Sequence, residues 1–278
     1  MKRPIEAQFV YLDSNVIIGI CDGQLDRLKS TITTAIQSGR VVYPFSSSQV
    51  TEITSHPLTE RCRTRLNLLS SISKDIYFVH SVYDYEFRVE SPFSVYETIN
   101  EALPELNENK LFATMIPREH FKAVRQQFGL DPVRLNNLSG VAAVTEIDRA
   151  ISGAIPDGVD APRSIREMLQ ITKQIARDHF SALWGQIGTT EDHMTIGGDL
   201  QGVFTLLECF GYWPDSEEVY KKGSRFLDAQ HTFNASHFDV LVTQDKGMKN
   251  RTQAAYAVLG IGTQVMLASE YEAYILQS

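Results

Sequence analysis

The chain has 278 residues, of which 43% are hydrophobic and 22% are charged, and its formal net charge is −8. This composition fits one large folded domain, or a domain with a subdomain, and excludes a mostly disordered chain. The negative net charge argues against a surface that is basic throughout and binds nucleic acid non-specifically. Local basic patches can still occur in a protein with this net charge.

The cysteine pattern and the apolar content indicate where the protein works. Cys21, Cys62 and Cys209 lie far apart and form no Cys-x-x-Cys pair, so we expect neither a thiolate zinc site nor a disulfide framework. A sparse, odd cysteine count is typical of a reducing cytoplasm. No signal-peptide core follows Met1, and no apolar run reaches about 18 residues, so we expect a cytoplasmic protein without a membrane span.

Strand and helix patterns alternate along much of the chain. Short apolar runs predict strands at residues 9–12, 41–43, 76–79, 240–242 and 263–267. Apolar residues at helical spacing predict helices at residues 25–36, 165–184, 200–210 and 226–235. Because most of the strand runs do not alternate with polar residues, they are typical of strands buried on both faces. The sequence therefore predicts an α/β fold, a three-layer α/β/α sandwich with a mainly parallel sheet.

The middle of the chain departs from this alternation. From about Tyr83 to Pro214 helical patterns dominate, and six prolines divide the stretch. We interpret residues 83–214 as a helical insertion between two parts of the core, residues 1–82 and 215–278. At the start of this stretch Tyr83, Tyr85 and Phe87 alternate, which favours a half-buried strand over a base-stacking surface.

Acidic residues follow the predicted strands at places where they can meet. Asp13 comes directly after the first strand and Asp245 after the fourth. Because the carboxyl ends of parallel strands share one edge of the sheet, these side chains can be close in space. A serine-led helix after the second strand carries Glu52, and Asp228 lies three residues before His231 on the helix that precedes the fourth strand.

Each acid alone has an ordinary explanation, as a helix cap or a solvated charge, but together they predict a metal site. Clustered carboxylates repel one another unless a cation neutralises them. Oxygen ligands without cysteine and with little histidine suit Mg²⁺ or Mn²⁺. Hydrolysis of phosphodiester bonds is the chemistry that most needs this arrangement. Glu60 is an alternative to Glu52, whereas Asp239, the alternative to Asp228, lies at the start of a strand and so at the wrong edge.

Four segments together resemble the PIN-domain nuclease family. They are Leu12-Asp13-Ser14-Asn15, the serine-led helix from Ser46 to Glu52, Asp228-Ala229-Gln230-His231, and Val242-Thr243-Gln244-Asp245-Lys246. The resemblance covers roughly residues 8–80 and 215–270. It implies metal-binding and catalytic roles for Asp13, Glu52, Asp228 and Asp245, and supporting roles for Asn15 and Thr243. We expect His231 to pack or bond beside the site.

Basic residues flank the motif segments and are candidates for contacts with a nucleic-acid backbone. They are Lys246, Lys249 and Arg251; Arg61, Arg63 and Arg65; and Lys221, Lys222 and Arg225. Ordinary solvated helix faces explain the same pattern equally well.

The sequence thus predicts a Mg²⁺- or Mn²⁺-dependent nuclease, most consistent with an endoribonuclease of toxin-like, defence or RNA-turnover type. The main alternative is an inactive module of the same fold that binds nucleic acid or protein. A phosphatase of the haloacid-dehalogenase type ranks lower, because Asn15 stands where that chemistry needs a second Asp. The sequence does not decide whether the substrate is RNA or DNA. It also leaves open whether the chain forms a homo-oligomer and whether a protein partner binds through the helical insertion.

Overall fold

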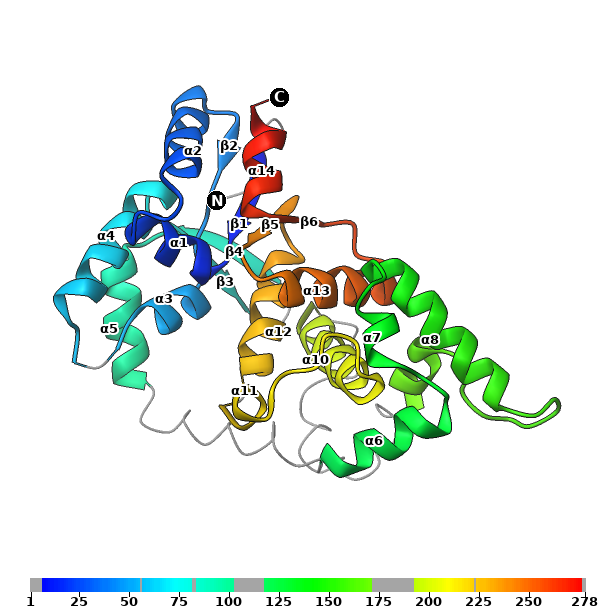
Figure 1. The fold of residues 1–278 in the computed structure, drawn as a ribbon. Helices are drawn as coiled ribbons and strands as arrows, with labels where there is room; N and C mark the ends of the chain where they lie inside the picture. The colour runs from blue at the N-terminus through cyan, green and yellow to red at the C-terminus, as the bar shows by residue number, and fades with distance from the viewer. Residues whose placement is uncertain are drawn as a thin grey trace. The chain divides into compact units, whose positions relative to one another are not determined.

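The computed structural model describes the backbone of residues 7–55, 57–81, 84–102, 118–171, 193–222 and 224–276. The chain divides into two compact units (Figure 1). The first comprises Met1–Asn109, Gln230–Lys249 and Gly262–Ser278, and the second comprises Lys110–Ala229 and Asn250–Ile261. Two helices, α12 (Ser224–Ala235) and α13 (Lys246–Leu259), have residues in both units.

A four-stranded parallel sheet forms the centre of the first unit. Its strands, in spatial order, are β2 (Val41–Val42), β1 (Gln8–Leu12), β5 (Val240–Thr243) and β6 (Gln264–Leu267). All three pairings are parallel, which confirms the predicted α/β class. The chain leaves β1 toward β2 on one side and leaves β5 toward β6 on the other. The carboxyl ends of β1 and β5 therefore form a topological switch point, where open α/β sheets place their ligands.

Helices flank this sheet and supply its apolar partners (Figure 1). In the first unit they are α1 (Ser14–Cys21), α2 (Asp26–Ser38), α3 (Ser47–Ile53), α4 (Glu60–Ser73), α5 (Pro92–Ala102) and α14 (Ala268–Ile275). The helix predicted before Gly39 is confirmed as α2, and Gly39 ends it with a left-handed φ of 70° that suits glycine. Buried Ile17 and Ile20 of α1 pack with Val10 and Val242 of the central strands in one hydrophobic core.

The third predicted strand lies in a different sheet from the one expected. β3 (Ile76–His80) pairs antiparallel with β4 (Tyr85–Val89) in a two-stranded hairpin. The connection is too short for the crossover that parallel pairing requires. A single parallel bridge joins Tyr77 to Phe45, just after β2. The half-buried strand predicted at Tyr85 and Phe87 is β4, and Phe87 is its buried residue.

The described part of the second unit is helical. Its helices are α6 (Arg118–Gln127), α7 (Pro132–Leu135), α8 (Gly140–Ala154), α10 (His193–Phe210) and α11 (Glu217–Lys222), with a helical stretch at 165–171. These confirm the helices predicted at 200–210 and at the start of 165–184; residues 172–192 lie outside the described residues. Among the described helices, none is both long and apolar enough to cross a membrane.

Two glycines of α8 give a matched test of packing in the second unit. A Cβ at Gly140 would lie 2.5 Å from the backbone nitrogen of Ala254, whereas a Cβ at Gly153 would meet nothing within 4 Å. Gly140→Ala should lower the free energy of unfolding by about 1–3 kcal/mol, because the backbone has to move. Gly153→Ala should raise it by about 0.5 kcal/mol through helix propensity. Urea unfolding followed by circular dichroism measures both, and equal effects would contradict this packing.

Candidate metal centre

Asp13 lies at the carboxyl end of β1, where it also begins a helix. Its backbone N–H donates to the carbonyl of Val242 on β5 at 2.8 Å, so the main chain there is fixed by the sheet. Its Oδ1 accepts a hydrogen bond from the N–H of Ser14 at 2.7 Å, as the N-cap of α1. Asp13 is only 3% exposed. The carboxylate is thus held in one orientation within the protein.

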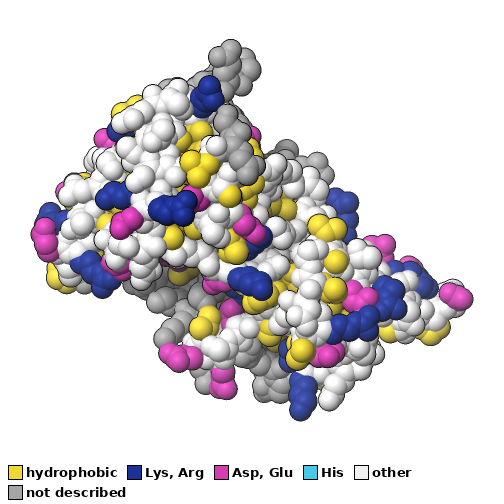
Figure 2. Space-filling view, turned by 45° about the horizontal axis from the view of Figure 1, so that its top comes forward, with side chains coloured by type: hydrophobic (Ala, Val, Ile, Leu, Met, Phe, Trp, Pro, Cys, Tyr) yellow, Lys and Arg dark blue, Asp and Glu magenta, His cyan; other side chains and the backbone are white. Residues whose placement is uncertain are grey.

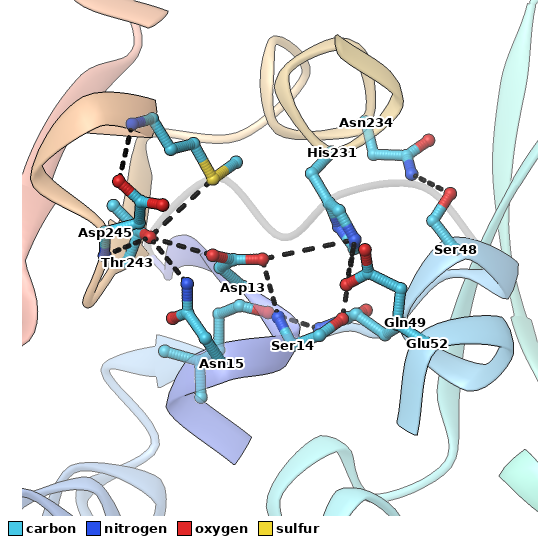
Figure 3. Close-up of polar contacts among 12 residues, drawn as sticks. Asp13, Ser14, Asn15, Ser48, Gln49, Glu52, His231, Asn234, Thr243 and Asp245 are labelled. Atoms are coloured by element: carbon cyan, nitrogen blue, oxygen red, sulfur yellow. Dashed lines mark hydrogen bonds and ion pairs between the residues drawn. The ribbon is translucent and has the colours of Figure 1, made fainter. Parts of the chain in front are cut away.

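Thr243 connects Asp13 to Asp245 (Figure 3). The Thr243 hydroxyl donates to Asp13 Oδ2 at 2.8 Å. The hydroxyl oxygen of Thr243 also accepts from the side-chain amide of Asn15 at 3.1 Å and from the N–H of Asp245 at 3.0 Å. Asp245 Oδ1 in turn accepts from the N–H of Met248 at 2.9 Å. The residues that follow β1 and β5 are therefore linked through Thr243 and the main-chain N–H of Asp245. The carboxylate of Asp245 is exposed and is not one of the three grouped ligands described below.

Glu52 and His231 complete a compact group with Asp13. The Nε2 atom of His231 lies 2.9 Å from Glu52 Oε2 and 4.0 Å from Asp13 Oδ1. One ligand atom from each of the three residues lies within 4.8 Å of the other two, which is the spacing of a potential metal site. Figure 3 shows the three side chains converging from β1, α3 and α12.

Gln49 positions the helix that carries Glu52. Its side-chain amide donates to the carbonyl of Leu12, the residue before Asp13, and its Oε1 accepts from the N–H of Ser46 at 2.7 Å. Gln49 is 1% exposed, so it ties the start of α3 to the end of β1 inside the protein. The sequence analysis missed this residue, although the Ser-x-x-Gln spacing at the start of a helix is the signature of a capping box.

A buried polar network lies behind His231. Its Nδ1 atom is 2.7 Å from the hydroxyl of Tyr11, which is 2.8 Å from Ser46 Oγ. The amide of Asn234 donates to Ser46 Oγ at 3.1 Å, and Asn234 Oδ1 lies 2.8 Å from His80 Nε2. Sequence reasoning found none of these partners, because residues from β1, β3, α12 and the start of α3 meet only in the folded protein.

The charges in the group depend on one another. Burial, and then the charge of Glu52, raise the pKa of Asp13 above its ordinary value, although His231 works against them. Burial also favours a higher pKa for Glu52, but the hydrogen bond and charge of His231 outweigh it and lower that pKa. Burial opposes a charge on His231, yet Tyr11, Glu52 and Asp13 raise its pKa well above the ordinary value. Positive charge is therefore stabilised between the two carboxylates.

Asp228 has a partner of another kind. Its Oδ2 accepts from Arg251 Nη2 at 2.6 Å, while Arg251 Nη1 donates to Asp215 at 2.6 Å. The Arg251 side chain is 5% exposed, so it forms a buried ion-pair network in the second unit, and its contact with substrate stays a prediction. Although Asp228 and His231 lie three residues apart on α12, they belong to different compact units. Arg251 is shared between Asp215 and Asp228, and Asp228 is not one of the three residues of the compact group, so its metal-binding role stays a prediction.

The other basic candidates differ in their surroundings. Lys249 forms an ion pair with Glu270, and Arg61 forms one with Asp22 at 2.8 Å. Arg63 and Lys246 are exposed, and Arg65 is partly buried. The side chains of Lys221, Lys222 and Arg225 lie outside the described residues. On the face drawn in Figure 2, basic and acidic side chains are interspersed.

No protein-family model, curated protein or solved structure matches this chain.

Replacing Thr243 tests the network that holds Asp13. Thr243→Val removes the hydroxyl that donates to Asp13 while keeping the shape, and it leaves a buried carboxylate oxygen without this donor. The free energy of unfolding should fall by about 1–3 kcal/mol. Thr243→Ser keeps the hydroxyl, so its free energy of unfolding should fall by less. Urea unfolding measures the difference, and equal losses in the two variants would show that the hydroxyl does not hold the carboxylate.

Proposed function

We propose that the protein is a metal-dependent nuclease that hydrolyses phosphodiester bonds, with RNA as its substrate. The observation that carries the proposal is the buried group of Asp13, Glu52 and His231 at the switch point of a parallel sheet. The resemblance of the sequence motifs to PIN-domain nucleases supports the same reaction and favours RNA.

The donor set fits a divalent cation. Asp13 is buried and its pKa is raised by burial and by the charge of Glu52, so the pair is costly without a compensating positive charge. Carboxylate oxygens are the ligands that Mg²⁺ and Mn²⁺ prefer. Asp245 is exposed and joins Thr243 through its main-chain N–H, and the sequence motif is the support for a carboxylate from Asp245 at the ion. When bound, such an ion would polarise the phosphate and activate water for attack on phosphorus.

The reaction needs little covalent help from the protein. One P–O ester bond breaks and one P–O bond forms to the oxygen of water. One proton of the water ends on the leaving oxygen, and the other goes with the new phosphomonoester and dissociates to solvent. The roles left to this chain are to fix the carboxylates, which Thr243, Gln49 and the N–H of Ser14 do, and to hold the phosphate backbone. Exposed Lys246, next to Asp245, is our first candidate for that contact.

A second candidate function rests on His231. A protonated imidazole between Glu52 and Asp13 supplies positive charge without any metal ion. A protein that relied on this charge would keep the fold and lack the chemistry, as an inactive module that binds nucleic acid or protein. Such a module would bind no Mn²⁺ at the acids and would not be stabilised by it.

Two glutamates on successive helices give a matched test of the nuclease. Glu52→Gln should lower Mn²⁺-dependent cleavage of single-stranded RNA by on the order of 100-fold or more. The reason is that losing a metal ligand should cost more activity than losing a residue that only orients a metal ligand. Glu60→Gln changes an exposed glutamate at the start of α4 and should cleave like the parent. Single-stranded DNA of the same sequence tests the preference for RNA.

The assay is a time course of labelled RNA with millimolar Mn²⁺, repeated with a chelator. Thermal unfolding shows whether each variant is folded. Cleavage that survives Glu52→Gln, or that persists in the chelator, would contradict the proposed metal centre. A parent protein with no cleavage and no stabilisation by Mn²⁺ would favour the inactive module.

A further inference from the structure

We infer that His231 is itself a ligand of the ion, and that the centre therefore selects a transition-metal ion such as Mn²⁺ over Mg²⁺. This inference rests on the proposed function for the position of the ion. It differs from the sequence expectation, which placed His231 beside the site and did not separate the two ions. It follows from the position of the imidazole, from what holds it, and from the chemistry of its nitrogen.

The position of Nε2 is that of a ligand atom. With bonds of about 2.0–2.2 Å, two ligand atoms of one ion lie about 3–4 Å apart. Nε2 is 2.9 Å from Glu52 Oε2 and 4.0 Å from Asp13 Oδ1, so its separations already fall at that spacing. An ion placed between the two carboxylates would therefore meet this nitrogen as well.

The imidazole is held so that Nε2 faces the carboxylates. His231 is 1% exposed, and its other nitrogen lies 2.7 Å from the hydroxyl of Tyr11, which is fully buried. With the ring proton on Nδ1, that N–H donates to Tyr11 and the Nε2 lone pair points to the acids. Ligand histidines are commonly oriented by such a hydrogen bond from the ring nitrogen that does not bind the metal. Tyr11 is thus a positioning residue in this account.

The ring of His231 has little freedom to turn away. Tyr11 is fixed in its turn by Ser46, and Asn234 donates to Ser46 and to Ser48 at 3.0 Å. The network is buried and joins β1, α12 and the start of α3. Rotation of the ring would break the contact with Tyr11 and the contact with Glu52 together.

A nitrogen ligand changes which ion the centre prefers. Mg²⁺ takes oxygen ligands and keeps several waters, whereas imidazole binds first-row transition ions well. Two carboxylates and one imidazole therefore favour Mn²⁺ and its neighbours, and a centre of carboxylates alone would discriminate less. The preference of the centre for Mn²⁺ over Mg²⁺ should therefore depend on His231.

The test is binding of the metal alone to the full chain. Pulsed electron paramagnetic resonance of bound Mn²⁺ should show coupling to a directly bound nitrogen in the parent. The signal should be absent from His231→Gln and present in His120→Gln, which changes an exposed histidine outside the group. By calorimetry, the parent should prefer Mn²⁺ over Mg²⁺, and His231→Gln should lower this ratio by about tenfold or more.

Tyr11→Phe separates position from ligation. It leaves the imidazole in place but removes its hydroxyl partner, so Mn²⁺ affinity should fall by about tenfold while the nitrogen coupling remains. Unchanged affinity would overturn the positioning role of Tyr11.

Glu52→Gln separates failure of this inference from failure of the proposed function. Mn²⁺ binding without nitrogen coupling that is weakened by Glu52→Gln but not by His231→Gln would mean that the ion occupies the proposed centre and that His231 is not its ligand. If Glu52→Gln also binds Mn²⁺ like the parent, both the inference and the proposed centre are wrong.

Discussion

Two carboxylates brought together, one buried and one partly exposed, are the constraint around which the site is built. Asp13 is almost fully buried, and a ligand oxygen of Glu52 lies within 4.8 Å of one of its own. Two carboxylates in such a place repel each other unless one of them is protonated or positive charge lies between them. In the structure the Nε2 atom of His231 lies 2.9 Å from Glu52 Oε2 and 4.0 Å from Asp13 Oδ1, and the neighbouring acids and Tyr11 raise the pKa of the imidazole against the opposing effect of burial. The three groups therefore already have the spacing of a potential metal site.

The fold delivers these groups without demanding that they be close in sequence. Asp13 and Thr243 follow adjacent strands of one parallel sheet, so the backbone brings them to the same edge. Gln49 bonds the carbonyl of Leu12, which fixes α3 and thereby Glu52 against that edge. His231 arrives from α12, which leads into β5. Loss of any one of these connections would loosen a pair of charges that repel each other.

Local patterns predicted much of the fold and the acids at strand ends. Apolar runs and helical spacing located β1, β2, β5, β6, α2 and α10, and the rule that parallel strands share their carboxyl edge put Asp13 near Asp245. The pattern could not choose between pairing partners for residues 76–79, since an apolar run reads alike in a hairpin and in a parallel sheet.

Side-chain partners were the least predictable part. Asp228 and Arg251 are 23 residues apart and meet through tertiary packing, which the Asp-x-x-His spacing does not report. The contacts of His231 with Tyr11 and Glu52 were missed for the same reason. A histidine whose two nitrogens both face polar groups inside a protein is visible only in three dimensions.

The most direct measurement of the central claim is anomalous scattering from crystals of the protein soaked in Mn²⁺. The account predicts one peak between Asp13 and Glu52, within about 2.0–2.3 Å of an oxygen of each. The absence of a peak between the Asp13 and Glu52 carboxylates would contradict the account, whether or not Mn²⁺ binds at another place in the crystal.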